Sequence, residues 1–518
     1  MAFHCFNCGG HMVFDVASQL MRCEHCDTTI EPSALKLRED AIMTEHVTCQ
    51  NCGAELEGTE DSLVGFCPYC GGQSLVRAAG EASEVEAIVP FKVTKESCVE
   101  LYQNYTKGVP YLAKEFKDTE YLDKFLGIYM PYHAYDVEVE NVMIEGMTSA
   151  HHGRTTINKY YDITVETEGD YLMGAPYDAS KYLSDELSDR VMPFDMKDRK
   201  AYHPAYLSGF YADASTTPAS LYELDAARQA FEEVQDLAIE RATAERSNMH
   251  SLKGKQGSGR VFDHHLELFP YWFINWRNED RIAYAAINGQ TGKVISDLPL
   301  NMKSFAIGCV AVSLALFALL EFFVDLTVGL TAFLSMIAAA LMAWQIYSIA
   351  QRLHNLETHA EDKGFTENAE GNALRMDKRH KKGSSFKTIL LFFIGVQVFV
   401  APMLGITDLD FAFNPRTSFF LRVTPVAVLL ICLFVLVKVV MWHKVLKEWN
   451  SPVAIGSLVF AVFVCAACIL FAPPEDIFYY IAVIITDIGL ITSSVALIRA
   501  YNISTTRPIP KIYDRKEV

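Results

Sequence analysis

Eight cysteines in the first 70 residues are spaced so that they could hold two metal ions. Four of them follow a C-x2-C-x14-C-x2-C pattern: Cys5, Cys8, Cys23 and Cys26. The same pattern returns further along the chain in Cys49, Cys52, Cys67 and Cys70. Two C-x2-C pairs supply the tetrahedral shell of four sulfurs that is typical of structural zinc. The sequence therefore predicts two zinc ribbons, each with one zinc ion.

Two alternatives to structural zinc are less consistent with these residues. Disulfides belong to secreted domains, and we expect no signal peptide in the few residues before Cys5. A catalytic zinc needs an open coordination position, which four cysteines close. A nearby histidine could replace one cysteine, but surface histidines are the simpler interpretation of His4, His11, His25 and His46.

The second half of the chain is rich in long apolar runs. Each has about the 20 residues that span a bilayer as a helix. We predict six spans, at residues 304–324, 328–349, 388–407, 418–441, 453–472 and 478–498. Buried helices of a large soluble enzyme are the alternative, and six such runs almost free of charge argue against it.

Lysine and arginine in the loops predict the orientation of these spans. The loop at 350–387 holds eight of them, and the alternate loops between the spans hold only Arg416. We therefore expect the basic loops and both termini to be cytoplasmic, in a multi-pass protein of the cell membrane. Thiolate ligands of zinc also fit a reducing compartment.

The acidic charge of the predicted ribbons indicates what kind of partner they could bind. Residues 1–77 carry four basic and eleven acidic residues, and the whole chain has a net charge of −18. A nucleic-acid-binding surface needs cationic groups for its phosphate contacts. Nucleic acid is therefore an unlikely ligand, and cytoplasmic proteins are the expected partners, together with the lipid bilayer.

The region between the ribbons and the first span shows mixed periodicity. Apolar and polar residues alternate in 136–140 and 162–166, which predicts strands, and the glycine-containing segment 145–154 could join them as a long hairpin. We expect a helix from Pro218 to about Met249, with an apolar stripe at Leu224, Ala227, Phe231, Val234 and Ala238. Three more strands are expected in 268–300, with the NGQTG segment as a hairpin turn rather than a phosphate loop.

Other residue types that could do chemistry are scattered. Asp487 lies in the middle of the last span, where an ionisable residue is costly and is expected to face the interior of the bundle. It is the candidate functional residue of the membrane region, with a structural hydrogen bond as the alternative. His151–His152 and His264–His265 are interpreted as loop histidines, and Cys465 and Cys468 as packing residues. No catalytic motif is found, so no enzyme is predicted.

The ribbons, the IYMPYHAYD segment (128–136) and YAAINGQTGKVISDLPLN (284–301) together resemble bacterial membrane proteins that are described as TFIIB-type zinc-ribbon-containing. The NGQTGKxxxxLP motif before the first span is the most specific part of the resemblance. It implies a role like that of membrane-stress components that recruit cytoplasmic proteins to the bilayer. Similar chains are sometimes labelled as primosomal replication helicase, but this chain has no ATP-binding loop. It also differs from simpler relatives, which have one or two spans.

Together these features predict a multi-domain protein with small β ribbons, an α+β domain and an all-α transmembrane bundle. The expected divisions are ribbons at 1–32 and 44–77, a linker at 78–88, the α+β domain at 89–300, six transmembrane helices within 301–500 and a cytoplasmic tail at 501–518. The expected function is a membrane-anchored adaptor that docks cytoplasmic proteins. The alternative is a transporter or channel-like protein with a regulatory ribbon domain.

Overall fold

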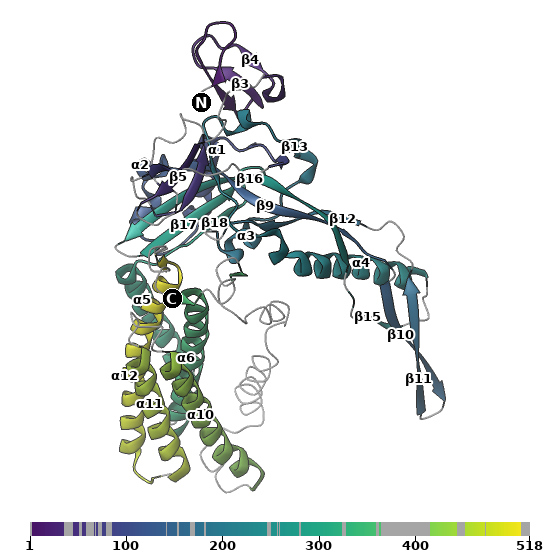
Figure 1. The fold of residues 1–518 in the computed structure, drawn as a ribbon. Helices are drawn as coiled ribbons and strands as arrows, with labels where there is room; N and C mark the ends of the chain where they lie inside the picture. The colour runs from purple at the N-terminus through teal and green to yellow at the C-terminus, as the bar shows by residue number, and fades with distance from the viewer. Residues whose placement is uncertain are drawn as a thin grey trace.

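The computed structural model describes a small β region, a large mixed sheet, a lateral arm and a group of apolar helices (Figure 1). The described residues are 3–35, 45–50, 54–58, 67, 69–70, 75–78, 85–140, 142–152, 155–165, 171–180, 183–245, 250–255, 257, 259–278, 281–323, 328–358, 362–363, 415–442, 451–471 and 473–508. The large sheet lies between the small β region and the helices in Figure 1.

The first ribbon is a sheet of its own. Its four antiparallel strands follow each other in chain order: β1 (Phe3–His4), β2 (His11–Asp15), β3 (Leu20–Cys23) and β4 (Thr29–Ile30). The short helix η1 (Pro32–Ala34) follows. Phe14 packs edge-on against Tyr206, and the Ser208 hydroxyl donates to the carbonyl oxygen of Met12 at 2.8 Å. The ribbon is therefore seated on the large domain.

The second ribbon belongs to the large sheet. Its strands are β5 (Glu45–Cys49), β6 (Glu55–Gly58) and β7 (Leu75–Ala78), and β6 pairs with β14 (Tyr211–Asp213). The segment predicted as a linker contains β8 (Ala87–Ile88), which pairs with β13 (Lys200–Ala201) and with β16 (Arg260–Asn278). In the described chain, the second ribbon is thus continuous with the domain that follows it.

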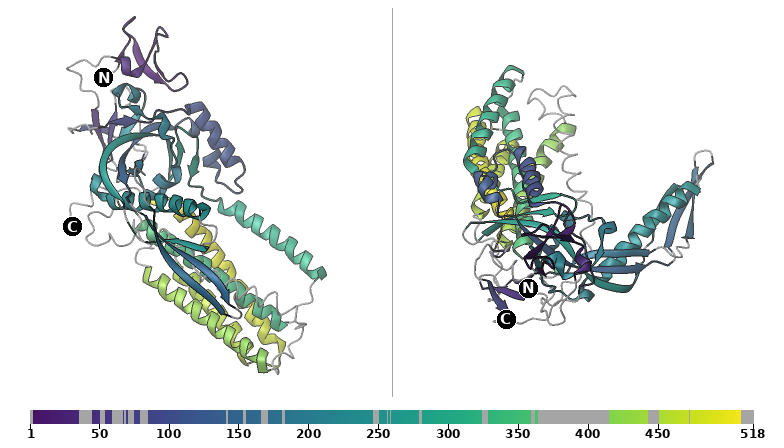
Figure 2. Two further views of the ribbon diagram at one scale, coloured as in Figure 1. Left: turned by 90° about the vertical axis from the view of Figure 1, so that its right-hand side faces the viewer. Right: turned by 90° about the horizontal axis from the view of Figure 1, so that it is seen from above.

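The centre of the large sheet is formed by β9 (Leu126–Glu138), which contains the IYMPYHAYD segment, and β16, which contains LFPYWFINW (268–276). The two strands pair antiparallel, with Pro131 opposite Leu268. Further strands are β12 (Tyr171–Asp178), β17 (Arg281–Asn288) and β18 (Val294–Ser296). The predicted NGQTG turn is confirmed, because the Asn288 N–H donates to the Lys293 carbonyl oxygen at 3.0 Å. The sheet curls strongly (Figure 2).

Short helices cover this sheet. They are α1 (Lys95–Lys107), η2 (Lys114–Lys117), α2 (Thr119–Leu122), α3 (Asp185–Val191), η3 (Met196–Asp198), η4 (Pro204–Leu207) and η5 (Ala219–Leu221). The side chain of Thr94 caps α1 by accepting from the Ser97 N–H at 3.3 Å. The core contains many aromatic rings, such as Phe91, which stacks on Phe210 with 4.4 Å between ring centroids.

A long arm leaves the sheet sideways. It consists of β10 (Val142–His152), β11 (Thr155–Val165), β15 (His250–Gly254) and the helix α4 (Glu223–Glu245). The predicted long hairpin through 145–154 is confirmed, since β10 is paired along its whole length with β11. Its first strand begins at Val142, whereas the expected strand at 136–140 falls at the end of β9. The predicted stripe of α4 is wrong at Leu224, which is 64% exposed. Tyr222, Ala226 and Ala230 complete the buried face instead.

The described chain has five apolar helices after residue 300: α5 (Met302–Phe323), α6 (Val328–Glu357), α10 (Pro415–Trp442), α11 (Ser451–Phe471) and α12 (Asp476–Ser504). The last four pack against one another as a bundle, and α5 contributes no residue to its described core. Three of them contain segments long and apolar enough to cross a membrane: Thr331–Leu356, Ala454–Phe471 and Asp476–Ser504. The predicted span at 388–407 lies outside the described residues. Small side chains such as Ala339, Ala343 and Ala461 let the helices pack closely.

The first and the last of the apolar helices, α5 and α12, are both joined to the sheet domain. The side chain of Asn502, near the end of α12, exchanges two hydrogen bonds with the backbone of Leu300, just before α5, each 2.9 Å long. After α12 the chain forms β19 (Arg507–Pro508), which pairs with β17. The start of α5 and the end of α12 thus lie together beside the sheet domain.

Candidate metal centres

The first cysteine cluster has the geometry of a four-sulfur metal site. The Sγ atoms of Cys5, Cys8, Cys23 and Cys26 all lie within 4.8 Å of one another. Cys5 Sγ is 3.6 Å from Cys26 Sγ, and Cys8 Sγ is 3.5 Å from Cys23 Sγ. Zinc bonded to four sulfurs at about 2.3 Å would place those sulfurs about 3.8 Å apart. The cluster could therefore hold a metal ion with little movement.

Backbone and hydroxyl groups support the thiolates. The Asn7 N–H donates to Cys5 Sγ and the Gly10 N–H to Cys8 Sγ, each at 3.4 Å, as expected in a metal-binding knuckle. Thr28 Oγ1 lies 3.0 Å from Cys26 Sγ. The Thr28 side chain and backbone lower the pKa of the Cys26 thiol to about 6. These contacts favour the deprotonated form that binds a metal.

Two glycines shape the first knuckle, each for a different reason. Gly9 has a φ of +73°, which disfavours other residues. Gly10 is close to its neighbours instead: a Cβ there would lie 2.9 Å from the Cβ of His25 and 3.3 Å from two cysteine sulfurs. The rings of His4 and His11 lie 5.2 Å apart between centroids and are tilted by 43°.

The second cluster is described for three of its four cysteines. The Sγ atoms of Cys49, Cys67 and Cys70 lie within 4.8 Å of one another, and all three residues are buried. Cys49 Sγ is 3.5 Å from Cys70 Sγ. Cys52 lies outside the described residues, so its place in the cluster stays a prediction. The three sulfurs form one face of a tetrahedral site that a fourth ligand would complete.

The second cluster is attached to the sheet by a tyrosine that the cysteine pattern does not reveal. Tyr69 stands between Cys67 and Cys70, and its hydroxyl donates to Asp213 Oδ2 at 2.6 Å. Tyr284 of β17 donates in turn to the Tyr69 carbonyl oxygen at 2.6 Å. Burial, followed by the charge of Asp213, raises the pKa of Tyr69 well above its ordinary value. The tyrosine is thus a neutral donor in a closed contact.

A group of buried carboxylates lies where the chain after α6 meets the sheet domain. Asp178, Asp185 and Asp362 are 4%, 3% and 8% exposed. Burial and the nearby charges of Asp185, Asp362 and Asp189 raise the pKa of Asp178 well above its ordinary value. The Lys363 N–H donates to Asp185 Oδ2 at 3.2 Å, and the Lys363 ammonium pairs with Asp225. No sequence motif marked this group, because Asp178 and Asp185 lie on different elements, β12 and α3, and Asp362 comes more than 170 residues later.

The other candidates from the sequence are dispersed. Both histidine pairs lie on strands rather than loops, and His265 is buried with its Nε2 2.6 Å from Glu267 Oε1. Cys465 packs beside the hydroxyl of Thr486 at 3.1 Å, in agreement with a packing role. Asp487, next to Thr486, is exposed on the described part of the bundle. The expectation that it faces the interior is therefore not met by the described helices.

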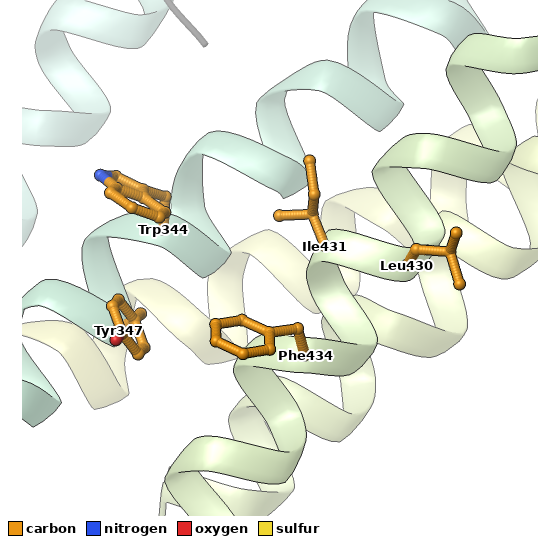
Figure 3. Close-up of a pocket in the computed structure, with 5 residues that line it drawn as sticks. All are labelled: Trp344, Tyr347, Leu430, Ile431 and Phe434. Atoms are coloured by element: carbon orange, nitrogen blue, oxygen red, sulfur yellow. The ribbon is translucent and has the colours of Figure 1, made fainter. Parts of the chain in front are cut away.

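An apolar cavity of about 500 Å³ lies between α6 and α10. Trp344 and Tyr347 on α6 face Ile431 and Phe434 on α10 across it, with Leu430 at its side (Figure 3). Its lining is almost wholly apolar. Such a lining suits a hydrocarbon chain better than a polar solute.

The comparisons with known proteins give one relative and no family. The chain is 24% identical over 340 residues to the uncharacterized protein YdjG of Bacillus subtilis (strain 168), a match that covers 59% of this chain and 92% of that protein. No family model matches the chain. No solved structure matches it either. The similarity to YdjG extends over most of that protein but carries no statement about function.

Proposed function

We propose that this protein is a membrane-anchored zinc-ribbon adaptor that docks cytoplasmic proteins at the bilayer, in the manner of the membrane-stress components that its sequence resembles. The observation that carries the proposal is the position of the first ribbon. It stands at the end of the molecule opposite the helical bundle (Figure 1). An anchored protein would therefore hold this ribbon away from the bilayer.

The surface of the first ribbon supports a docking role. Phe6, inside the first knuckle between Cys5 and Cys8, is 71% exposed. An exposed aromatic residue on a rigid, metal-stapled turn is well suited to anchor a partner protein, because it loses little conformational freedom on binding. We assign zinc to both clusters, with Cys52 as the fourth ligand of the second.

The two ribbons have different roles in this proposal. The strands of the first pair only with one another, whereas the second contributes strands to the large sheet. The second ribbon is therefore a structural element of the α+β domain, and the first is the docking module.

Six spans and cytoplasmic termini are part of the proposal. The helix α6 ends beside the sheet domain, where Arg352 lies 3.5 Å from Glu186. The helix α12 also ends beside the sheet, where β19 pairs with β17. The Ser493 hydroxyl on the second half of α12 donates to the Ala454 carbonyl oxygen near the start of α11 at 3.1 Å. The antiparallel helix α11 therefore begins at the sheet end of the bundle. The helix before it, α10, then starts at the opposite end. The end of α6 and the start of α10 thus lie at opposite ends of the bundle, as the predicted span at 388–407 between them would require.

Affinity capture of the full-length protein from its own cells tests the adaptor role. Phe6→Ser removes the exposed ring without changing a metal ligand. The matched control is Leu224→Ser, which removes an apolar side chain of 64% exposure from α4. We expect a defined set of cytoplasmic proteins to be captured by the wild type and by Leu224→Ser, and to be lost with Phe6→Ser.

Zinc content of each variant separates docking from folding. If Phe6→Ser retains both its zinc and its partners, the docking role of the first ribbon is wrong. If it loses zinc, the variant has damaged the ribbon, and Phe6→Ala, which also removes the ring, replaces it in the test.

Transport is the second candidate, and Asp487 is the residue that favours it. An exposed carboxylate midway along an apolar helix is costly in lipid and calls for a partner or a function. Asp487→Asn decides between the two functions. An adaptor keeps its partners and its cellular activity with this change, whereas a transporter keeps its partners but loses activity.

A further inference from the structure

The arm of the sheet domain reaches toward the membrane region rather than away from it. In Figure 1 the hairpin of β10 and β11 descends from the sheet on the same side as the helical bundle, and its end lies level with the helices. The view turned by 90° about the vertical axis shows the same descent (Figure 2). A lateral space separates the hairpin from the bundle in Figure 1, so the hairpin is not a part of the helix packing.

The outer strand of this hairpin is exposed and carries aromatic side chains. Every residue from Thr155 to Asp162 is exposed. Ile157, Tyr160 and Tyr161 are 47%, 64% and 42% exposed, although they are among the largest side chains of the strand. Tyrosine is enriched where a protein meets the headgroup layer, because its ring is apolar and its hydroxyl is polar.

The end of the hairpin lacks acidic residues in a strongly acidic chain. Residues 147–161 contain two basic residues, Arg154 and Lys159, two histidines and no aspartate or glutamate, whereas the whole chain carries 63 acidic residues. The acidic residues that flank this stretch are Glu145 and Asp162. Asp162 is paired with Lys255, Nζ to Oδ1 at 2.7 Å. This local charge is complementary to an anionic surface.

We propose that the β10–β11 hairpin binds the headgroup layer of the membrane that the bundle spans, with anionic phospholipids as its ligands. The hydrocarbon layer itself is excluded, because β11 is an edge strand whose unpaired N–H and C=O groups need water or headgroups as partners. The contact therefore requires the arm to lie higher along the bundle than in Figure 1, on the surface of the bilayer. Tyr160 and Tyr161 provide the interfacial rings, and Lys159 provides charge. The proposal rests on the membrane anchoring proposed above and is independent of ribbon docking.

The base of the arm packs against the central strand of the sheet, so a contact at the end of the arm is coupled to the sheet. The helix α4 packs along the hairpin base, where Phe231, Val234 and Ala238 share one buried cluster with Val142 and Ile144. The Gln235 side chain donates to the Lys255 carbonyl oxygen at 2.7 Å. The same cluster includes Tyr135 and Val137 of β9, the central strand of the sheet. A change at the membrane surface would thus reach the domain that carries the first ribbon.

Site-specific photo-crosslinking of the full-length protein in nanodiscs tests the contact. The photoreactive residue p-benzoylphenylalanine replaces Tyr160 in one sample and Phe6, at the opposite end of the molecule, in the control. Nanodiscs contain either phosphatidylcholine alone or phosphatidylcholine with phosphatidylglycerol. We expect a phospholipid adduct at position 160 and none at position 6, with a higher yield when phosphatidylglycerol is present. Lys159→Gln should lower the yield on anionic nanodiscs by roughly fivefold, whereas Lys107→Gln on α1 should not.

The possible outcomes separate the two proposals. Protein that fails to enter nanodiscs contradicts the membrane anchoring. Protein that enters nanodiscs but gives no more lipid adduct at position 160 than at position 6 overturns the hairpin contact. A crosslink from position 160 to a second copy of the chain also overturns it, since the strand would then be a protein interface. Equal yields in both lipids would contradict the preference for anionic headgroups.

Discussion

The hydroxyl of Tyr69 donates to the carboxylate of Asp213 over 2.6 Å, and this contact joins the second cysteine cluster to strand β14, beside the pairing of β14 with β6. Tyr69 is 3% exposed and Asp213 2% exposed, so neither group can exchange its partner for bulk water. The second cluster and the sheet are thereby parts of one packed unit, which leads to the first two predictions.

Tyr69→Phe should destabilise the sheet domain by about 1–3 kcal/mol, because it removes a donor from a buried carboxylate. The measurement is the free energy of unfolding of the purified protein by denaturant. Tyr160→Phe removes a hydroxyl from an exposed ring on β11 and should have little effect. Equal stability of Tyr69→Phe and the wild type would show that the contact contributes nothing to the fold.

Loss of one ligand should have different consequences in the two clusters. Cys23 and Cys49 are both fully buried and both end a strand, so Cys23→Ser and Cys49→Ser form a matched pair. Each variant should bind one zinc ion instead of two, as measured by atomic emission. Cys49→Ser should also lower the unfolding temperature of the large domain, because its strands belong to that sheet.

For Cys23→Ser we expect the first ribbon to unfold while the near-ultraviolet circular dichroism of the large domain is largely kept. An identical loss of stability in both variants would mean that the first ribbon is as integral to the domain as the second.

Asp178→Asn should stabilise the protein at neutral pH. Burial raises the folded-state pKa of Asp178 above the unfolded value of about 3.9, so the folded protein binds this proton more tightly than the unfolded chain does. Stability is therefore lost as the pH rises from about 4 through the folded-state pKa. Asparagine does not titrate, so Asp178→Asn avoids this loss. Its unfolding temperature should exceed that of the wild type most at high pH, and the difference should shrink as the pH falls.

Glu96→Gln, on the exposed first turn of α1, is the control for a lost negative charge. A gain from Asp178→Asn that does not depend on pH would indicate better packing, and would contradict a role for the raised pKa.

Arg281→Ala should loosen the junction between the sheet and the bundle. The Arg281 guanidinium donates to Thr506 Oγ1 at 2.7 Å and to the carbonyl oxygens of Ile503 and Thr506 at 2.9 and 2.8 Å. Losing these bonds should cost about 2 kcal/mol. Hydrogen exchange in β17 and near residue 505 should become faster, as followed by mass spectrometry.

Arg22→Ala provides the comparison, since Arg22 and Asp27 pair on the open surface with 53% and 74% exposure of their side chains. Such a pair contributes about 0–1 kcal/mol. An effect of Arg281→Ala no larger than that of Arg22→Ala would show that the junction depends on β19 pairing alone.

The parts of this molecule that depend on local spacing could be predicted from the sequence. The first cysteine cluster, the strands after residue 260 and the NGQTG turn follow from patterns within about 30 residues. The helix α4 and most of its predicted apolar face are confirmed, since Ala227, Phe231, Val234 and Ala238 are buried, and the exception is Leu224, which is 64% exposed. Periodicity alone does not show where a partner surface begins.

Features that join distant segments were beyond the sequence patterns. The pairing of β6 with β14 connects residues about 150 positions apart, and the carboxylate group around Asp178 gathers three separate segments. Neither leaves a local periodicity. The long hairpin through residues 145–154 could be predicted from the sequence, but its place in a separate three-stranded sheet, beside β15 from about 100 residues later, could not.

The short strand β19 has a consequence for how the protein is made. Its residues, Arg507 and Pro508, leave the ribosome only after every helix of the bundle, yet they pair with Ile282 and Arg281, which were synthesised more than 220 residues earlier. Since β18 covers β17 only from Ala285 to Ile287, the edge at Arg281 and Ile282 stays open until the chain after the last helix is made. A chain cut short before residue 507 keeps this part of the edge exposed, which distinguishes it from a finished molecule.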